Sequence, residues 1–223
     1  MKNPWTIIAV IAVVLIGGSI WYAGTVAEKN NEGITFSPNI KGNAQATVTL
    51  AEYSDFQCPA CASFHPVVAD VMDEFGDKIA FEYKHFPLPI HPLAEPAARA
   101  AEAAGLQGKF FEFHDLLFIN QKAWSNSPNP MVFFREYATE LELDVDLFER
   151  QYGASLVRDK VRTEAAEARE LGLTGTPTFF LNGERMVIQT YEDFYNQIAA
   201  AVNPAGTGTT TVTAPVVEFG IPQ

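Results

Sequence analysis

The longest apolar run of the chain lies at its N-terminus, where the sequence reads IIAVIAVVLIGGSIWYAG. No residue between Lys2 and Glu28 is charged. A helix of roughly 20 apolar residues is long enough to span a hydrocarbon core of about 30 Å, and Trp21 and Tyr22 stand where interfacial aromatic residues are found. The pattern therefore predicts a transmembrane signal-anchor over residues 1–27.

A secretory signal that is later cleaved is the alternative reading of this segment. Its apolar stretch exceeds the usual length of a signal core, and GTVAEK is a poor small-x-small cleavage site. An uncleaved anchor is therefore favoured. Because long segments are translocated largely regardless of charge, the domain that follows is expected outside the cytoplasm, held at the cell membrane by a single span.

Beyond the anchor, the apolar positions predict a strand, a helix and a second strand in succession. Residues 28–46 are polar and are interpreted as a tether with a first short strand at 34–36. A β-branched, apolar strand is predicted at 47–53, an amphipathic helix at 59–75 and a strand at 79–86. A parallel pair of strands joined by a right-handed crossover is the default for such a unit.

Residues 94–173 have the apolar spacing of helices and little strand character. Turn-forming residues divide this segment into five predicted helices, at 97–104, 110–118, 131–141, 145–152 and 156–171. One group of ring-bearing residues is interpreted as hydrophobic core rather than as a cofactor site: His65, His114, Phe110, Phe111, Phe113 and Phe118. Trp124 and Met131 are core or groove candidates. The charged run 159–170 is expected to be a solvated helix face.

Near the end of the chain, the apolar and turn-forming residues again predict strands. A hairpin is predicted over 176–188, turning at Asn182 and Gly183, followed by a helix at 192–202. The last segment, 203–223, is a low-complexity tail, either loose or forming one added edge strand. The domain therefore consists of a first α/β part at 47–93, a helical insertion at 94–173 and a second α/β part at 174–202.

Composition narrows the class of protein. The 223 residues include 27 acidic and 15 basic side chains, giving a net charge of −12 without any run of Lys or Arg, so nucleic acid is not expected as a partner. With 48% hydrophobic residues, the chain can bury a sizeable core. Its two cysteines are too few for a disulfide scaffold.

Both cysteines lie in one motif, Cys58-Pro59-Ala60-Cys61, between a predicted strand and a predicted helix. Unpaired N–H groups and the helix dipole stabilise an anion at a helix N-terminus, so the pKa of Cys58 should be lowered. Pro59 suits the first helical position. Cys61, one turn later, can attack a mixed disulfide formed at Cys58, which supplies the two steps of thiol–disulfide exchange.

Three other roles for the motif compete with exchange. A structural disulfide closing so short a ring gains only about 2 kcal/mol. Zinc could use His85 and His91, but the two prolines between them rule out a ligand-presenting helix, and there is no second C-x-x-C. Two inert buried thiols do not suit a turn preceded by the polar Ser54, Asp55 and Gln57. No metal or organic cofactor is expected.

The order strand, CPAC, helix, strand, helical insertion and GTPTFFLNG resembles the DsbA family of the thioredoxin superfamily, in particular its membrane-anchored members. The resemblance covers roughly residues 34–202 and implies an α/β thioredoxin fold with a helical insertion domain. It implies a cis bond between Thr176 and Pro177 beside the cysteines, with Thr176 pairing its backbone to the substrate chain. Pro59 and Ala60 would also contact the substrate.

The resemblance further implies that Glu52 and Lys84 form a buried acid–base pair beneath the cysteines. A carboxyl group in an apolar core has a raised pKa and could move protons to and from Cys61. A structural ion pair or an exposed edge lysine is the alternative for Lys84. Position 60 is alanine where strongly oxidising relatives often carry histidine, so a less extreme pKa for Cys58 and a less oxidising potential are expected.

The expected function is that of an extracytoplasmic thiol–disulfide oxidoreductase that forms disulfides in exported proteins. Reduced exported proteins would be its substrates, and a quinone-coupled membrane protein would reoxidise it. Two alternatives stay open. The same residues could act as a reductase or isomerase, because direction depends on potential. The chain could instead be a peptide-binding chaperone in which the cysteines are incidental.

Overall fold

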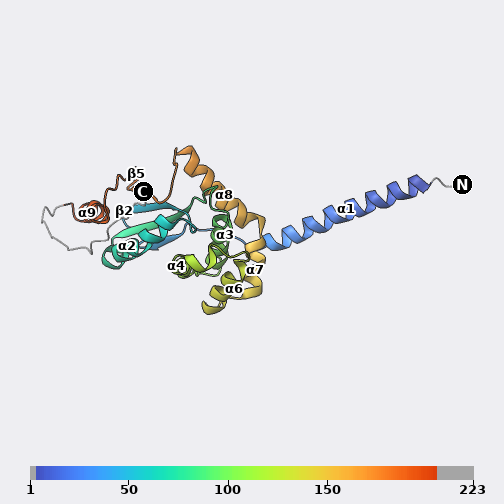
Figure 1. The fold of residues 1–223 in the computed structure, drawn as a ribbon, viewed down its shortest axis with the longest axis horizontal. Coiled ribbons are helices and arrows are strands. Elements are labelled where there is room, and N and C mark those ends of the chain that lie inside the picture. Colours follow the sequence, from blue (N-terminus) through green and yellow to red (C-terminus); the bar gives the residue numbers. More distant parts are fainter. Residues whose placement is uncertain (1–3, 205–223) are drawn as a thin grey trace.

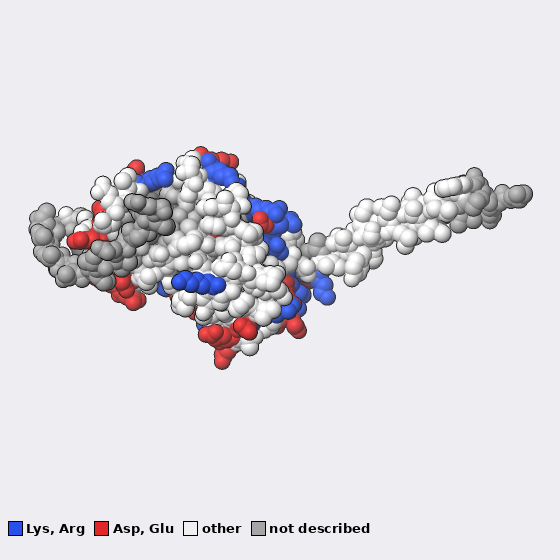
Figure 2. All heavy atoms as spheres, viewed as in Figure 1, with Lys and Arg blue, Asp and Glu red and all other residues white. Residues whose placement is uncertain are grey.

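The structure is a computed structural model that describes residues 4–204, so most of the tail expected at 203–223 lies outside the described residues. Helix α1 (Pro4–Asn31) projects from the folded domain as an isolated rod (Figure 1). In Figure 2 the visible, described part of this rod shows no charged side chain beyond its junction with the domain, and Ile11–Asn31 of α1 is long and apolar enough to cross a membrane. Length and composition alone support this assignment.

The junction between α1 and the domain differs from the expected tether. Residues 28–31 continue the helix, and Asn31 is fixed to the start of α8 (Ser155–Glu170). Its Nδ2 donates to Ser155 Oγ at 2.8 Å, and its Oδ1 accepts from the backbone N–H of Leu156 at 3.2 Å. The helix therefore ends on the helical insertion and not in a free linker.

The first strand was predicted in the wrong place. Strand β1 is Ile40–Gly42, whereas residues 34–36 form no strand. An edge strand forms where the neighbouring strand has unpaired backbone groups, and β1 runs antiparallel to β3 (Ile79–His85), with Ile40 opposite Glu82. Phe36 instead lies under the ammonium group of Lys160, 5.6 Å from the ring centre.

The central sheet confirms the rest of the strand prediction. Its order is β1-β3-β2-β4-β5, with β2 (Val48–Ser54) parallel to β3 and antiparallel to β4 (Thr178–Leu181). Strand β5 (Glu184–Arg185) closes the predicted hairpin, and Asn182 and Gly183 take up the positive φ values that its turn requires.

Helices cover both faces of this sheet (Figure 1). On one face lie α2 (Pro59–Phe75), as predicted, and α9 (Tyr191–Val202), where Phe179 of β4 packs against Phe64 and Phe194. On the other face, Tyr53 of β2 packs near Ala165 and Ala168 of α8. Because successive side chains of a strand point to opposite faces, Glu52 and Ser54 are directed to the α2 side.

The helical insertion contains the five predicted helices and a short one that was not predicted. They are α3 (Ala94–Gly105), α4 (Phe110–Ile119), α5 (Gln121–Trp124), α6 (Met131–Glu140), α7 (Val145–Gly153) and α8. Four residues are too few to show helical periodicity, so α5 could not be predicted from the apolar pattern. Trp124 belongs to the core: its ring is fully buried, and its Nε1 donates to Leu117 O at 2.7 Å. Phe110, Phe113 and Phe118 are buried as expected.

Candidate active site

Cys58 is the residue that caps the N-terminus of α2, with Pro59 in the first turn. Its backbone N–H donates to Asp55 O at 3.0 Å, which closes the turn from β2 into the helix. Both cysteines are free thiols, and Cys61 is completely buried while Cys58 retains 7% exposure. Pro59 and Ala60 are exposed beside them. Cys58 therefore lies nearer the surface than Cys61, next to the exposed Pro59 and Ala60.

The loop before β4 lies against Cys58. The peptide bond between Thr176 and Pro177 is cis, as the family resemblance implies. When it is protonated, the Cys58 thiol donates a hydrogen bond to Thr176 O at 3.4 Å, across 118 residues of sequence. The structure therefore brings together four of the sequence-predicted site residues: Cys58, Cys61, Thr176 and Pro177.

The two thiols have opposite electrostatic environments. The Cys61 thiol donates a hydrogen bond to the Cys58 thiolate and, against the cost of burial, lowers the pKa of Cys58 to about 5. The Thr176 side chain and the backbone N–H groups of Ala60 and Cys61 act in the same direction. Burial raises the pKa of Cys61 well above its usual range. At neutral pH the site therefore holds one thiolate and one thiol.

A cluster of buried polar side chains lies next to Cys61. Glu52 is 3% exposed, and burial raises its pKa to about 7, with a further upward contribution from the Cys58 charge. Tyr83 faces it in the register of β2 and β3, and burial raises the pKa of that phenol well above its usual range. The hydroxyl groups of Ser54 and Tyr83 are also buried there. Glu52 is thus a carboxyl group that can be protonated near neutral pH beside Cys61.

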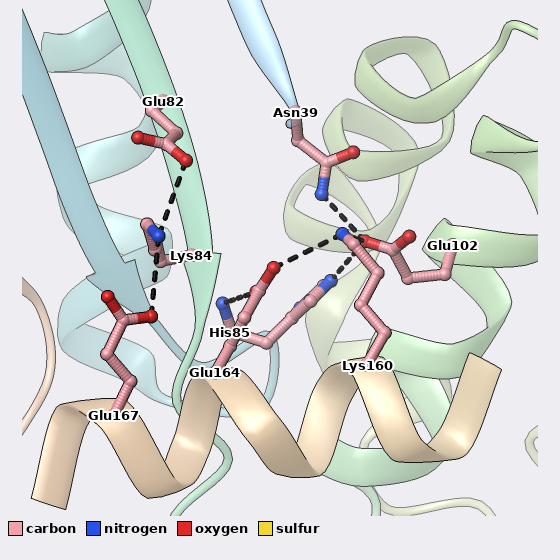
Figure 3. A network of polar contacts seen from close by, with 8 residues as sticks. All are labelled: Asn39, Glu82, Lys84, His85, Glu102, Lys160, Glu164 and Glu167. Atoms are coloured by element: carbon pink, nitrogen blue, oxygen red, sulfur yellow. Dashed lines mark hydrogen bonds and ion pairs between the residues drawn. The ribbon is translucent and has the colours of Figure 1, made fainter. Parts of the chain in front are cut away.

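Lys84 does not take part in this buried cluster, so the expected pair with Glu52 is wrong. In the sheet register Glu52 faces Tyr83, and Lys84 faces Tyr53. Its side chain therefore points to the α8 side, where Nζ lies 3.4 Å from carboxylate oxygens of both Glu82 and Glu167 (Figure 3). Lys84 instead forms ion pairs with Glu82 and Glu167, as in the structural ion-pair alternative, and its side chain is 21% exposed.

Two side chains that sequence reasoning did not assign hold the cysteine loop in place. The buried carboxylate of Asp55 accepts hydrogen bonds from the backbone of Gln57 at 2.7 Å and from His91 Nδ1 at 2.8 Å. Gln121 Nε2 donates to the carbonyl oxygens of Phe56 and Cys58, at 2.8 and 2.9 Å. Asp55 could have been found from its position beside the cysteine motif. Gln121 could not, because it lies 63 residues from Cys58 in the sequence.

The zinc alternative at His85 and His91 finds no support in the geometry. His91 is bonded to Asp55, and His85 Nε2 is bonded to Glu102 Oε1 at 2.8 Å. The two rings therefore belong to different carboxylates. Among residues 4–204, neither ring shares a metal-compatible cluster with the cysteines.

Glu102 anchors a second buried polar network, at the junction of the sheet and the insertion (Figure 3). Its Oε1 accepts from Asn39 Nδ2 at 2.6 Å, from His85 and from Lys160. Glu164 accepts from the backbone N–H of His85 at 2.8 Å and pairs with Lys160 at 3.2 Å. This part of the run 159–170 is therefore not the solvated face that was expected. Although burial disfavours its charge, the His85 and Lys160 contacts lower the pKa of Glu102 to about 2.

The comparisons with known proteins agree with this geometry. A family model described as thioredoxin matches residues 36–200. The chain belongs to the thioredoxin family. A thioredoxin-like oxidoreductase from Silicibacter pomeroyi superposes with a TM-score of 0.63 at 26% identity, over 76% of this chain and 94% of that one.

Solved DsbA-type proteins share the fold at lower identity. Wolbachia pipientis alpha-DsbA1 matches with a TM-score of 0.65 at 23% identity, over 79% of this chain and 96% of that one. Oxidised BdbD from Bacillus subtilis matches with a TM-score of 0.65 at 18% identity, over 74% of this chain and 93% of that one. The thioredoxin-family protein described here has a DsbA-like fold, and its site is that of a thiol–disulfide oxidoreductase.

Curated relatives carry a different name. A Na(+)/H(+) antiporter NhaA 1 from Mycobacterium sp. (strain KMS) is 38% identical over 152 residues, 66% of this chain and 24% of that protein. An antiporter NhaA 1 from Salinispora arenicola is 37% identical over 174 residues, which are 77% of this chain and 25% of that protein. The chain thus spans about a quarter of the length of these relatives, and the antiporter name describes much longer proteins.

Proposed function

We propose that the protein is a membrane-anchored, extracytoplasmic oxidoreductase that forms disulfides in exported proteins. The observation that carries the proposal is the contrast between its two sulfurs: a Cys58 that retains 7% exposure and has a pKa of about 5, and a fully buried Cys61 with a raised pKa. A disulfide is passed on most readily when the sulfur that must leave is a stable thiolate.

The proposed reaction transfers the Cys58–Cys61 disulfide to the substrate. A substrate thiolate attacks Cys58 Sγ, the bond to Cys61 Sγ breaks, and Cys61 takes up a proton, for which Glu52 is the nearby source. A second substrate thiolate attacks the substrate sulfur of the mixed disulfide, and Cys58 leaves as thiolate. The substrate loses two electrons to form its disulfide, and the enzyme is left as the thiolate–thiol pair.

Substrate selection is proposed to rest on the cis loop and the exposed end of the motif. The backbone of Thr176 would hydrogen-bond an extended substrate segment, and Pro177 has no N–H that competes for it. Pro59 and Ala60 would lie against the same segment, because both are exposed at the entrance to Cys58. Recognition through backbone groups would accept many exported sequences.

Turnover requires an oxidant that accepts two electrons and two protons from the dithiol. We assign this part to a quinone-coupled membrane protein, because α1 would hold the domain in the same membrane. Membranes that contain such a partner should restore the disulfide of the enzyme when quinone is added. Reoxidation by membranes without quinone would contradict the assignment.

The redox potential measured against glutathione tests the direction of the reaction. A Cys58 pKa of about 5 lies between the values of about 7 for thioredoxin and about 3.5 for DsbA, so the potential should lie between about −270 and −120 mV, closer to the oxidising end. The value also agrees with the less extreme pKa expected from Ala60. A potential at or below about −270 mV would instead indicate a reductase.

Activity on a reduced, unfolded test protein separates enzyme from chaperone. The wild type should restore its disulfides, Cys58→Ser should be inactive, and Cys61→Ser should accumulate a mixed disulfide with the substrate. A Cys58→Ser variant that still protects the test protein as well as wild type would support the chaperone alternative. Labelling Cys58 in intact cells with a membrane-impermeant thiol reagent tests the location, and labelling only after lysis would contradict it.

A further inference from the structure

A second cluster of titratable side chains lies between α2 and α4. His65 of α2 and the neighbouring His114 and Asp115 of α4 converge, although 50 residues separate the two segments. His65 Nε2 lies 2.9 Å from Asp115 Oδ1, and His114 Nδ1 lies 2.7 Å from the same oxygen. The proposed redox reaction uses none of these three residues.

The cluster lies at a small cavity that is open to solvent on one side. His114 is buried, His65 is mostly buried, and Asp115 keeps 36% exposure, so the cluster is reached from one side. The three side chains line a cavity of about 10 Å³, together with apolar neighbours such as Met72 and Phe111. A cavity of this size is close to the smallest that admits a single water-sized occupant.

The donor atoms match the preference of zinc. One atom from each of the three residues lies within 4.8 Å of the other two, close enough to contact one ion. Two imidazole nitrogens and a carboxylate oxygen are a common three-residue ligand set for Zn²⁺, with a water completing the tetrahedron. The open side of Asp115 leaves room for that water.

We propose that His65, His114 and Asp115 form a Zn²⁺ site that joins α2 to the helical insertion. The two ring N–H groups that face Asp115 would move to the other ring nitrogens, and the freed lone pairs would bind the metal. Lys41 Nζ, 3.8 Å from Asp115 Oδ2, is the opposing charge. Its side chain is 41% exposed, so it can turn into solvent when the ion binds.

Such a site would brace the helix that carries Cys58. A hydrogen bond to Asp115 and ring contacts with His114 and Phe118 already join His65 to α4, and an ion held by both helices would add to their resistance to separation. Anything that binds the folded state alone raises its stability with ligand concentration. Zinc should therefore raise the melting temperature of the domain whether or not the cysteines react.

The test uses the full chain with Cys58→Ser and Cys61→Ser, because the active-site thiols would themselves bind zinc. Equilibrium dialysis should give one Zn²⁺ per chain, and Co²⁺ should show the visible absorption of a tetrahedral complex that Zn²⁺ abolishes. His65→Ala and Asp115→Asn should each weaken binding at least about tenfold. Both positions are partly exposed, and circular dichroism checks that the variants fold.

Two further variants make the result specific. His91→Ala removes a histidine that belongs to another carboxylate and should leave zinc affinity unchanged. Lys41→Met should tighten binding, because it removes the opposing charge. Absence of binding in the double serine chain, or equal affinity in His65→Ala and its parent, would overturn the site. Because the test contains no active cysteine, its outcome is independent of the proposed redox function.

Discussion

Glu52 and Glu102 are both almost fully buried, yet they have opposite charge states. Glu52 is 3% exposed, and its pKa is raised to about 7, whereas Glu102 is 2% exposed, and its pKa is lowered to about 2. Burial raises the pKa of both carboxyl groups. The difference comes from their neighbours: Glu102 is bonded to the Lys160 ammonium and to the His85 ring, and Glu52 has hydroxyl groups and sulfur.

The contrast separates a structural use of a buried carboxyl group from a chemical one. A carboxylate that is fully paired keeps its charge over the whole physiological pH range and can fix two parts of a fold together. One that lacks a cation is held near its titration point and can exchange a proton. The first arrangement lies between the sheet and the insertion, and the second lies beneath Cys61.

The largest expected effect is the loss of stability in Glu102→Ala. Removing this carboxylate leaves Lys160, His85 and Asn39 buried without their shared acceptor, and breaking a buried ion pair in this way costs about 3–5 kcal/mol. The free energy of unfolding in urea measures it. Glu112→Ala removes an exposed partner of Lys109 and serves as the control, with less than about 1 kcal/mol expected. Equal losses in both variants would refute the assigned role of Glu102.

The pH dependence of stability should have opposite signs for the two residues. Because the folded-state pKa of Glu52 is raised, its own contribution to stability should be lost as pH rises from about 4.5 to 7, by about 3 kcal/mol in all. Glu52→Gln should match wild type near pH 4 and exceed it above pH 7. Because the pKa of Glu102 is lowered, its contribution should be present above pH 4.5 and lost toward pH 2.

Unfolding curves of wild type, Glu52→Gln and Glu102→Gln at several pH values, all in the reduced state, measure both trends. The difference between each variant and wild type isolates one carboxyl group from the others that titrate. A Glu52→Gln curve that runs parallel to that of wild type from pH 4 to 8 would show that Glu52 is not desolvated in the way the structure indicates.

Glu52→Gln should also slow the release of Cys61 as a leaving group. Without an acid beside it, the Cys61 sulfur must depart unprotonated or wait for water, so single-turnover oxidation of a test dithiol should fall at least about tenfold, or about 1.4 kcal/mol. In wild type, the oxidation rate plotted against pH should change near pH 7, where Glu52 loses its proton, and the variant should lack this change. If the variant keeps both the rate and this pH dependence, proton transfer does not pass through Glu52. Titration of Cys58 in both proteins shows whether a changed thiolate accounts for any difference.

The smallest effect is expected for Lys84→Ala. Its contacts with Glu82 and Glu167 are partly exposed, so stability should change by less than about 1 kcal/mol and the oxidation rate by less than about twofold. Unfolding and single-turnover measurements check both values. A loss of activity comparable with that of Glu52→Gln would restore Lys84 as a partner of the buried acid.

Local chemistry decided which features could be predicted from the sequence. The cysteine motif, Pro59 and the apolar face of α2 all lie within one segment, and that helix was predicted with its observed bounds. The hairpin around Asn182 and Gly183 was predicted from the same kind of local signal.

Features that depend on pairing between distant segments were missed. The site of β1 depends on the free edge of β3, and the face of Lys84 depends on the register that sets it opposite Tyr53. The partners of Glu102 lie 17, 58 and 63 residues away, so its network leaves no spacing pattern. Gln121 holds the cysteine loop from a helix too short to be recognised.

The attachment of α1 to α8 through Asn31 has a consequence for how the enzyme would meet its substrates. At about 1.5 Å per residue, its 28 residues make a rod of about 42 Å, of which a bilayer would cover about 30 Å. With so short a spacer, Cys58 would stay within a protein diameter of the lipid surface. Encounters with emerging chains and with an embedded oxidant would then be a lateral search at high local concentration, which speeds transfer without any added affinity.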